Sequence, residues 1–166
     1  MKRAFTMIEL IFVIVIIGIL AAIAIPKLNA TRDDATVSTM ISNARIAVYD
    51  IGSYIAASGT TVLASAKVDS ATRIDFNGAG CADLDENTTD LSPVQLTLCD
   101  ESVTPASACI TINVSDNGDV AVINASGPPT SICQVVAIDS AIISLAGIAD
   151  DPNGKLYHFA GERIKR

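Results

Sequence analysis

Tryptophan is absent from this sequence, and aromatic residues make up only 4 % of its 166 positions. Half of the residues are nevertheless hydrophobic. A soluble enzyme of this length would normally fill its core with more large aromatic side chains, so the apolar excess must have another location. That excess is concentrated between Phe5 and Ile25. The composition therefore predicts one modest domain plus a separate apolar segment.

Histidine is nearly absent as well, since His158 is the only one. It lies near the C-terminus and has no obvious carboxylate and nucleophile with which to form a catalytic group. No C-x-x-C pair is present either, so the familiar zinc-site spacings are not met. We expect no enzymatic activity, no metal centre of this kind and no cofactor.

Basic residues are too few for a head domain that binds nucleic acid. The formal net charge is -7, and the acidic residues lie almost wholly after Arg32. Phosphate binding requires clustered Lys and Arg. The short basic end, with Arg163, Lys165 and Arg166, is interpreted as a solvated terminus, and we predict no direct nucleic-acid binding.

Four cysteines occur in the C-terminal two-thirds of the chain: Cys81, Cys99, Cys109 and Cys133. An even number of cysteines in a small domain outside the cytoplasm predicts two disulfides. Three connectivities are open, of which we prefer the sequential one. In the chain-entropy model each such loop stabilises the fold by roughly 3 kcal/mol.

The apolar segment has the length of a membrane span. Residues 10–25 contain no polar side chain, and the 21 residues from Phe5 to Ile25 suffice to cross a hydrocarbon core of about 30 Å as a helix. Lys2 and Arg3 precede the segment and favour a cytoplasmic N-terminus. The residues after Pro26 are then expected in the periplasm or outside the cell.

An ordinary secretory signal peptide is the first alternative. Ala22-Ile23-Ala24 has the small-x-small form of a cleavage site, but the apolar region of a signal peptide normally has 7–15 residues. Glu9 also argues against it, because a carboxylate within a membrane segment costs several kcal/mol unless it is paired or protonated.

The sequence AFTMIE at positions 4–9, followed by the unbroken apolar run, resembles the class III leader and N-terminus of type IV pilins and type II secretion pseudopilins. The resemblance implies that a prepilin peptidase cuts the Ala4–Phe5 bond on the cytoplasmic side and methylates the new amine. Glu9 and Pro26 stand where the family has its glutamate and proline, and Gly18 also fits. Because the family usually has glycine before the cut, Ala4 predicts slower processing.

Glu9 has a physical role if a positive charge meets it inside the bilayer. In a filament its carboxylate can pair with the Phe5 amine of a neighbouring subunit, and two groups that are each costly in hydrocarbon then partly cancel. Such a pair would set the stagger between subunits. The alternative is an unpaired acid that reaches the membrane interface.

Beyond Pro26 the pattern is that of an amphipathic helix. Apolar residues recur at spacings of three and four: Val37, Met40, Ile41, Ala44, Val48, Ile51 and Ile55. We predict one long helix from about Phe5 to Ala57, ending at Ser58-Gly59. A kink or a partly melted stretch is expected between Gly18 and Pro26.

The remaining sequence predicts a small antiparallel sheet packed on the second half of this helix. The clearest signal is a hairpin with strands at 109–115 and 119–125 around Asp116-Asn117-Gly118. Residues 94–98 alternate like an earlier strand, and residues 132–149 suit a further strand or a short helix. The fold class is α+β and type IV pilin-like, with a leader at 1–4, a transmembrane or filament-core helix at 5–26, its amphipathic half at 27–58 and an extracytoplasmic β-rich head at 59–166.

Two weaker patterns lie in the head. Asp150, Asp151 and Asn153 are candidate calcium ligands, although Pro-Asn-Gly is also an ordinary turn. Three Asn-x-Ser/Thr sequences begin at Asn87, Asn113 and Asn124. The first has an acid two residues before the asparagine and resembles the extended acceptor of bacterial N-glycosylation.

The preferred function is structural: a subunit processed by a prepilin peptidase that polymerises into a type IV pilus or a pseudopilus. The expected partners are copies of itself, related minor subunits and the inner-membrane assembly platform. The expected location is the bacterial inner membrane, as a single-pass protein with a periplasmic head, and an extracytoplasmic filament. Pilus, secretion and DNA-uptake roles, and major or minor status, stay open. The rival from another class is a signal-anchored periplasmic binding module that does not polymerise.

Overall fold

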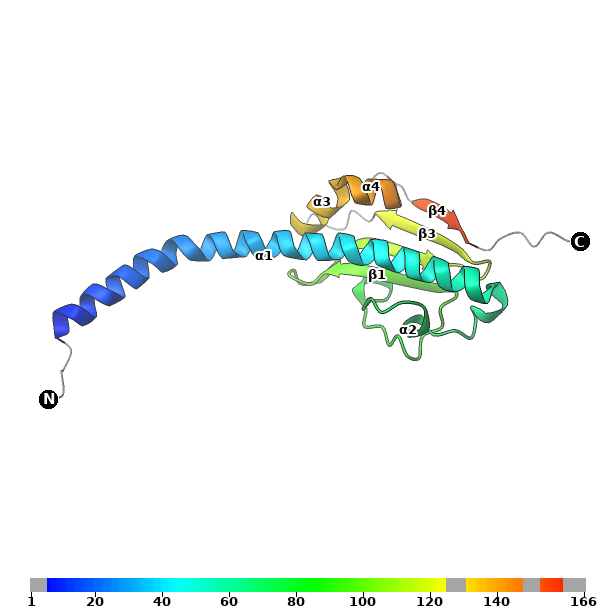
Figure 1. Ribbon diagram of the computed structural model, residues 1–166, viewed down its shortest axis with the longest axis horizontal. Coiled ribbons are helices and arrows are strands. Elements are labelled where there is room, and N and C mark those ends of the chain that lie inside the picture. The colour runs from blue at the N-terminus through cyan, green and yellow to red at the C-terminus, as the bar shows by residue number, and fades with distance from the viewer. Residues whose placement is uncertain (1–5, 125–130, 148–152, 160–166) are drawn as a thin grey trace, which may run out of the picture. The chain divides into compact units, whose positions relative to one another are not determined.

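The computed structural model describes residues 6–124, 131–147 and 153–159, except for the side chains of Asn29 and Ser131 (Figure 1). The chain divides into two compact units, Met1–Thr36 and Val37–Arg166. This division falls inside the predicted amphipathic half of the helix. The predicted domain boundaries stay predictions.

The first element, α1, runs from Met7 to Ser58 and contains Pro26. It is helical at every residue between Gly18 and Pro26, so the expected partly melted stretch is wrong, whereas the alternative of a kink stays a prediction. Proline costs the helix one backbone donor, but the residues around it in this run are otherwise good hosts for a helix. The helix stops within one residue of the predicted end. Gly59 follows with a φ of 76°, and its N–H donates to the carbonyl oxygen of Ile55 at 2.8 Å.

The second part of α1 buries the predicted apolar stripe within the Val37–Arg166 unit. Six of its seven members are buried, and Ile41 is half-buried. Ala47, which the pattern did not include, is buried as well. The spacing of three and four residues places all of these side chains on one face of the helix, and that face becomes part of the hydrophobic core.

The head is built on a four-stranded antiparallel sheet in the order β1-β2-β3-β4. The strands are β1 Val94–Asp100, β2 Ser107–Val114, β3 Asp119–Asn124 and β4 Lys155–His158. The predicted hairpin is confirmed as β2 and β3. Its turn contains Gly118 with a φ of 81°, and the Gly118 N–H donates to the Ser115 carbonyl oxygen at 3.0 Å.

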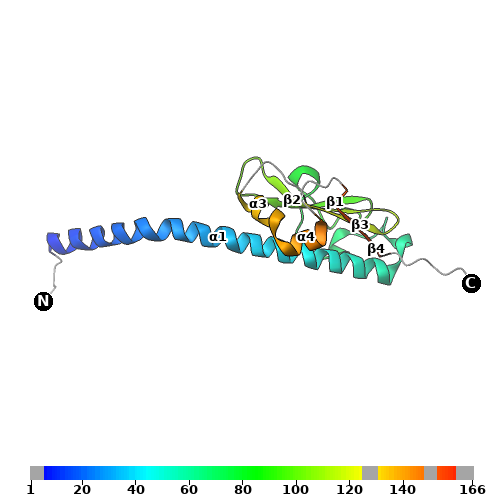
Figure 2. The same cartoon turned by 90° about the horizontal axis from the view of Figure 1, so that it is seen from above.

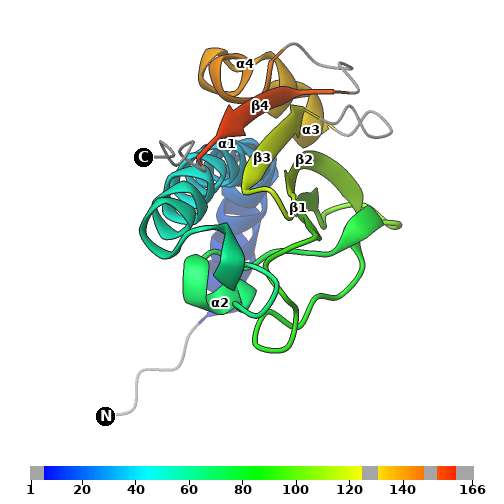
Figure 3. The same cartoon turned by 90° about the vertical axis from the view of Figure 1, so that its right-hand side faces the viewer.

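One face of this sheet forms the core together with α1. Because side chains alternate along a strand, every second residue of the first three strands lies on this face. Seven of them are buried and hydrophobic: Leu96, Leu98, Ile110, Ile112, Val114, Val120 and Val122. The second part of α1 runs alongside the strands, and Figure 3 shows it on one side of the sheet (Figures 1, 2 and 3). The predicted α+β class, with a long helix packed on a small antiparallel sheet, is confirmed.

The segment between α1 and β1 contains only short elements: η1 Thr60–Val62, α2 Val68–Ala71 and η2 Ala79–Cys81. Asn77 pairs with Thr97 on the free edge of β1, through two backbone hydrogen bonds of 2.9 and 2.7 Å. This pairing covers the middle of an edge that would otherwise present unpaired backbone groups.

The C-terminal part of the head contains two short helices, α3 Ser131–Ile138 and α4 Ser140–Ala146. Of the two expectations for residues 132–149, the helix is therefore right for the described residues. Asp139 begins α4 by accepting the Ala141 N–H on its side chain at 2.8 Å. Helix α3 contacts β2, and α4 contacts β3.

Strand β4 was not predicted. Gly154 leads into it with a φ of 59°, and a Cβ there would overlap the backbone of Val122. The strand is tied to α4 because the Tyr157 hydroxyl donates to the Leu145 carbonyl oxygen at 2.8 Å, and Lys155 Nζ donates to the Ser144 carbonyl oxygen at 2.6 Å. Its neighbour in the sheet, β3, is about 35 residues earlier in the chain, which is why no local turn signal points to the pairing.

Candidate functional site

The N-terminal end of α1 positions Glu9 through a reciprocal contact with Thr6. The backbone N–H and the hydroxyl of Thr6 both donate to Glu9 Oε2, at 3.0 and 2.8 Å, and the Glu9 N–H donates back to Thr6 Oγ1 at 3.4 Å. The Thr6 carbonyl accepts the Leu10 N–H at 3.3 Å. This is a capping box, in which a Thr and an acid three residues later satisfy each other and the end of the helix.

Thr6 is the residue that the sequence analysis missed. The signal was present as Thr6-x-x-Glu9 directly before an apolar run. Because of this contact, the Glu9 carboxylate has a hydrogen-bond partner, Thr6, within its own chain. Ala4 and Phe5, the predicted processing residues, lie outside the described residues.

The apolar run is presented outward along α1. Side chains such as Phe12, Ile19 and Ile25 are exposed, as are the other large apolar residues of this part of the helix. Among the described residues, α1 is the one helix long and apolar enough to cross a membrane, with a mean hydropathy of 3.1 over an 18-residue window. Exposed apolar surface of this extent requires lipid or protein around it.

Pro26 closes the apolar run inside the continuous helix. Lys27 follows it directly, and Arg32, Asp33 and Asp34 follow one to two turns later. All four charged side chains are exposed. The polarity of the helix surface therefore changes at Pro26, as the predicted end of the membrane segment requires.

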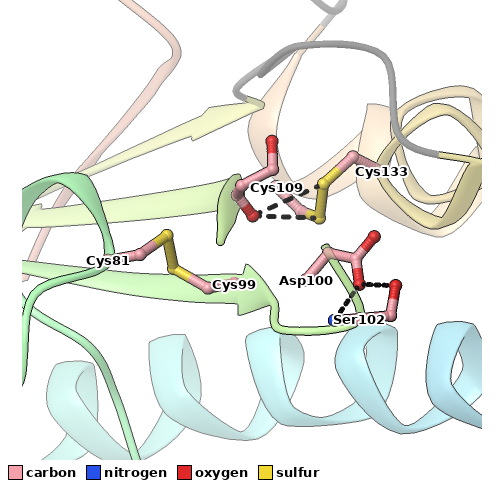
Figure 4. The surroundings of a disulfide bond; sticks show 7 residues. Cys81, Cys99, Asp100, Ser102, Cys109 and Cys133 are labelled. Carbon is pink, nitrogen blue, oxygen red and sulfur yellow. Dashed lines mark hydrogen bonds between the residues drawn. A yellow bond between two sulfur atoms is a disulfide. The ribbon is translucent and has the colours of Figure 1, made fainter. Parts of the chain in front are cut away.

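Two disulfides hold the head, and they have the sequential connectivity (Figure 4). Cys81–Cys99 joins η2 to β1, and both of its residues are half-buried. Cys109–Cys133 joins β2 to α3 and lies in the core, with exposed fractions of 0 % and 2 %. The described residues contain no free cysteine.

Beside these disulfides, Asp100 is a buried acid at the end of β1. Its Oδ1 accepts the N–H and the hydroxyl of Ser102, at 2.9 and 2.5 Å (Figure 4). These bonds hold the turn that follows the strand, which is a structural role.

The weaker candidates do not come together into a site. Asp150 and Asp151 lie outside the described residues, and Asn153 lies in the turn before β4. His158 Nδ1 lies 2.7 Å from Asp119 Oδ1, on the surface where β3 and β4 pair. Within the described ranges, no group of three or more His, Cys, Asp and Glu side chains has the arrangement needed to hold a metal ion.

Residues 1–25 match the family described as the prokaryotic N-terminal methylation motif. The match covers the basic leader, the Ala4–Phe5 bond, Glu9 and the apolar run. It identifies the N-terminus as a class III signal segment of the type IV pilin and pseudopilin kind. No curated protein and no solved structure matches the chain.

The motif at residues 1–25 supports a pilin-type or pseudopilin-type precursor. It implies processing by a prepilin peptidase and assembly with other pilin-like subunits. Together with the apolar helix it indicates membrane anchoring, and it indicates a structural subunit rather than an enzyme.

Proposed function

We propose that this chain is a structural subunit, a pilin or a pseudopilin, that is cleaved between Ala4 and Phe5, methylated on the new amine and polymerised into a thin filament. The observation that carries the proposal is the methylation motif at residues 1–25, with Glu9 at the start of an outward-facing apolar helix. Filaments of type IV pili, type II secretion and DNA uptake are all uses that this proposal covers.

The proposed assembly contact joins Glu9 of one subunit to the Phe5 amine of its neighbour. In the free subunit the carboxylate accepts two hydrogen bonds from Thr6. Each carboxylate oxygen can accept more than one bond. The Thr6 contact therefore orients Glu9 and leaves it able to receive an incoming ammonium group. An ion pair in a low-dielectric bundle is strongly favoured over either charge alone.

The proposed orientation follows from the charges that flank the helix. Lys2 and Arg3 stay cytoplasmic by the positive-inside rule, and the disulfide-bonded head then lies in the periplasm, where disulfides form. The proposed partners are copies of the same chain, related minor subunits, the peptidase and the inner-membrane assembly platform. Pro26 would mark the membrane or filament-core boundary in this arrangement.

The first experiment is the intact mass and N-terminal residue of the protein purified from its native membranes. A chain that begins at Phe5 and carries one added methyl group is the expected result. A start at Met1 would leave a signal-anchored protein that does not polymerise. A start near Ile25 would mean a cleaved secretory signal and a soluble head.

Glu9→Ala tests the assembly contact. The variant should be cleaved and methylated normally, because the change lies beyond the Ala4–Phe5 bond. Its incorporation into sheared filaments should fall by at least about tenfold, since the loss of one partner of a buried ion pair costs about 3–5 kcal/mol and 1.4 kcal/mol already corresponds to tenfold.

The matched control is Asp33→Asn, which removes an exposed acid of the same helix beyond Pro26. It should be incorporated like the unaltered chain. Wild-type incorporation of the Glu9→Ala subunit would contradict the proposed pairing with the Phe5 amine.

A further inference from the structure

Three Asn-x-Ser/Thr sequences occur in the head, and the structure separates them by access. Asn124 is only 1 % exposed, and its Nδ2 donates to the Ala137 carbonyl oxygen at 2.9 Å. Asn113 is half-buried near the C-terminal end of β2, where it pairs with Gln95 of β1 on one side and Ala121 of β3 on the other. Neither amide can enter the active site of a modifying enzyme without disruption of the head.

Asn87 is different because it lies exposed in the turn of the loop between η2 and β1. The residues on either side of the turn are anchored: the Glu86 carbonyl accepts the Asp69 N–H at 3.3 Å, and the Thr89 carbonyl accepts the Val68 N–H at 3.1 Å. Between these anchors, the Asn87 side-chain amide makes no hydrogen bond to any residue that the structure describes. The amide nitrogen is therefore presented to the surroundings.

An acid accompanies this amide in the turn. Asp85 is exposed two residues before Asn87, and its Oδ1 accepts the Asn87 backbone N–H at 3.1 Å. Thr89, two residues after Asn87, supplies the hydroxyl that the acceptor sequence requires. The extended pattern of acid, asparagine and hydroxyl thus coincides with the one accessible amide of the three.

We propose that Asn87 is a site of N-linked glycosylation by an oligosaccharide carried on a polyprenyl diphosphate. The Asn87 nitrogen attacks C1 of the first sugar. The new N–C1 bond forms as the bond from C1 to the diphosphate oxygen breaks. A base of the transferase takes one amide proton, and the polyprenyl diphosphate leaves.

This inference rests on the proposed function in one respect, since the head must reach the periplasmic side of the membrane to meet such a donor. The attached sugar is compatible with the folded head, because it would extend from the exposed Asn87 side chain into solvent. The backbone hydrogen bonds of Asp69 with Glu86 and of Val68 with Thr89 would stay intact. It would enlarge the surface around the acidic segment between Lys67 and Asp90.

The test is the intact mass of the protein from the cells that naturally produce it, compared with four variants. The unaltered protein should exceed its polypeptide mass by a fixed oligosaccharide increment. Asn87→Gln and Thr89→Ala should lose the whole increment, and Thr89→Ser should keep it because the hydroxyl is retained. Asn113→Gln, which alters a sequence of the same form inside the sheet, should also keep it.

An unaltered protein without the increment overturns the proposal, and so does an increment that persists in Asn87→Gln. The same spectra report the N-terminus independently. A chain that starts at Phe5 with one methyl group and carries no sugar would refute the glycan and leave the filament proposal standing. A glycosylated chain that starts at Met1 would support the glycan and refute the filament proposal.

Discussion

At the scale of single residues, Glu86 is a carboxylate of the head whose environment disfavours its charge. Burial raises the pKa of Glu86 above its ordinary value of 4.5, and the charges of Asp75 and Asp69 act in the same direction. The Phe76 N–H, which donates to Glu86 Oε1 at 2.6 Å, opposes the rise. The folded head therefore holds this proton more tightly than the unfolded chain does.

This difference predicts a pH dependence of stability. The contribution of Glu86 is fully present below pH 4.5 and is lost as the pH rises through the higher pKa of the folded state. Glu86→Gln keeps an oxygen for the Phe76 N–H and removes the charge. The variant should gain stability relative to the unaltered protein as the pH rises from 4 to 7, measured as the urea midpoint of unfolding.

Asp83→Asn, an exposed acid of the same loop, controls for the change in net charge. A stability difference between Glu86→Gln and the unaltered protein that is the same at pH 4 and pH 7 would show that the Glu86 charge does not matter.

At the scale of elements, the last described segment is fastened to the long helix by a close approach. Gly52 is buried on α1, and the ring of Phe159 occupies the space where a side chain at Gly52 would lie. Phe159 also stacks with Tyr157, with ring centroids 6.0 Å apart. Strand β4 thus contacts α4 through its polar groups, and Phe159, directly after the strand, contacts α1 through its ring.

Gly52→Ala should lower the free energy of unfolding by up to about 2 kcal/mol. Overpacking against Phe159 costs about 1–3 kcal/mol, whereas alanine improves helix propensity by about 1 kcal/mol. In a Phe159→Ala background the same change should be neutral or stabilising by up to about 1 kcal/mol. A double-mutant cycle of urea unfolding measures this, and the same loss in both backgrounds would rule out the contact as its cause.

At the scale of the whole molecule, the two disulfides tie distant parts of the head to the sheet. Cys81–Cys99 closes a loop with a sequence separation of 18 and Cys109–Cys133 one of 24. Cys81–Cys99 ties the segment before β1 to that strand at a partly exposed position. Cys109–Cys133 ties α3 to β2 within the core. Both agree with the proposed periplasmic location of the head, because disulfides form there.

Removal of the two bridges should have unequal effects. Cys81→Ser with Cys99→Ser should lower the free energy of unfolding by about 3 kcal/mol through loop entropy. Cys109→Ala with Cys133→Ala should cost more, because it also removes buried sulfur atoms from a packed core. Urea unfolding, monitored by near-ultraviolet circular dichroism, compares the two double variants. Equal losses in the free energy of unfolding would contradict a packing role for Cys109–Cys133.

The sequence alone determined the features that depend on neighbours along the chain. The basic leader, Glu9 and the apolar run identified the N-terminal segment, and the family match at residues 1–25 agrees with them. A spacing of three and four residues identified the buried face of α1, and Asn117-Gly118 identified the β2–β3 hairpin. Periodicity and turn chemistry act over a few residues, so a pattern can be read without knowledge of the fold.

Only the tertiary structure decided what depends on residues far apart. It selected one of three disulfide connectivities, made residues 131–138 and 140–146 helical rather than extended, and added β4 to the edge of β3. It also distinguished Asn87 from Asn113 and Asn124, which share the same short sequence. Pairing partners and burial are set by packing across the whole head, and no local pattern contains that information.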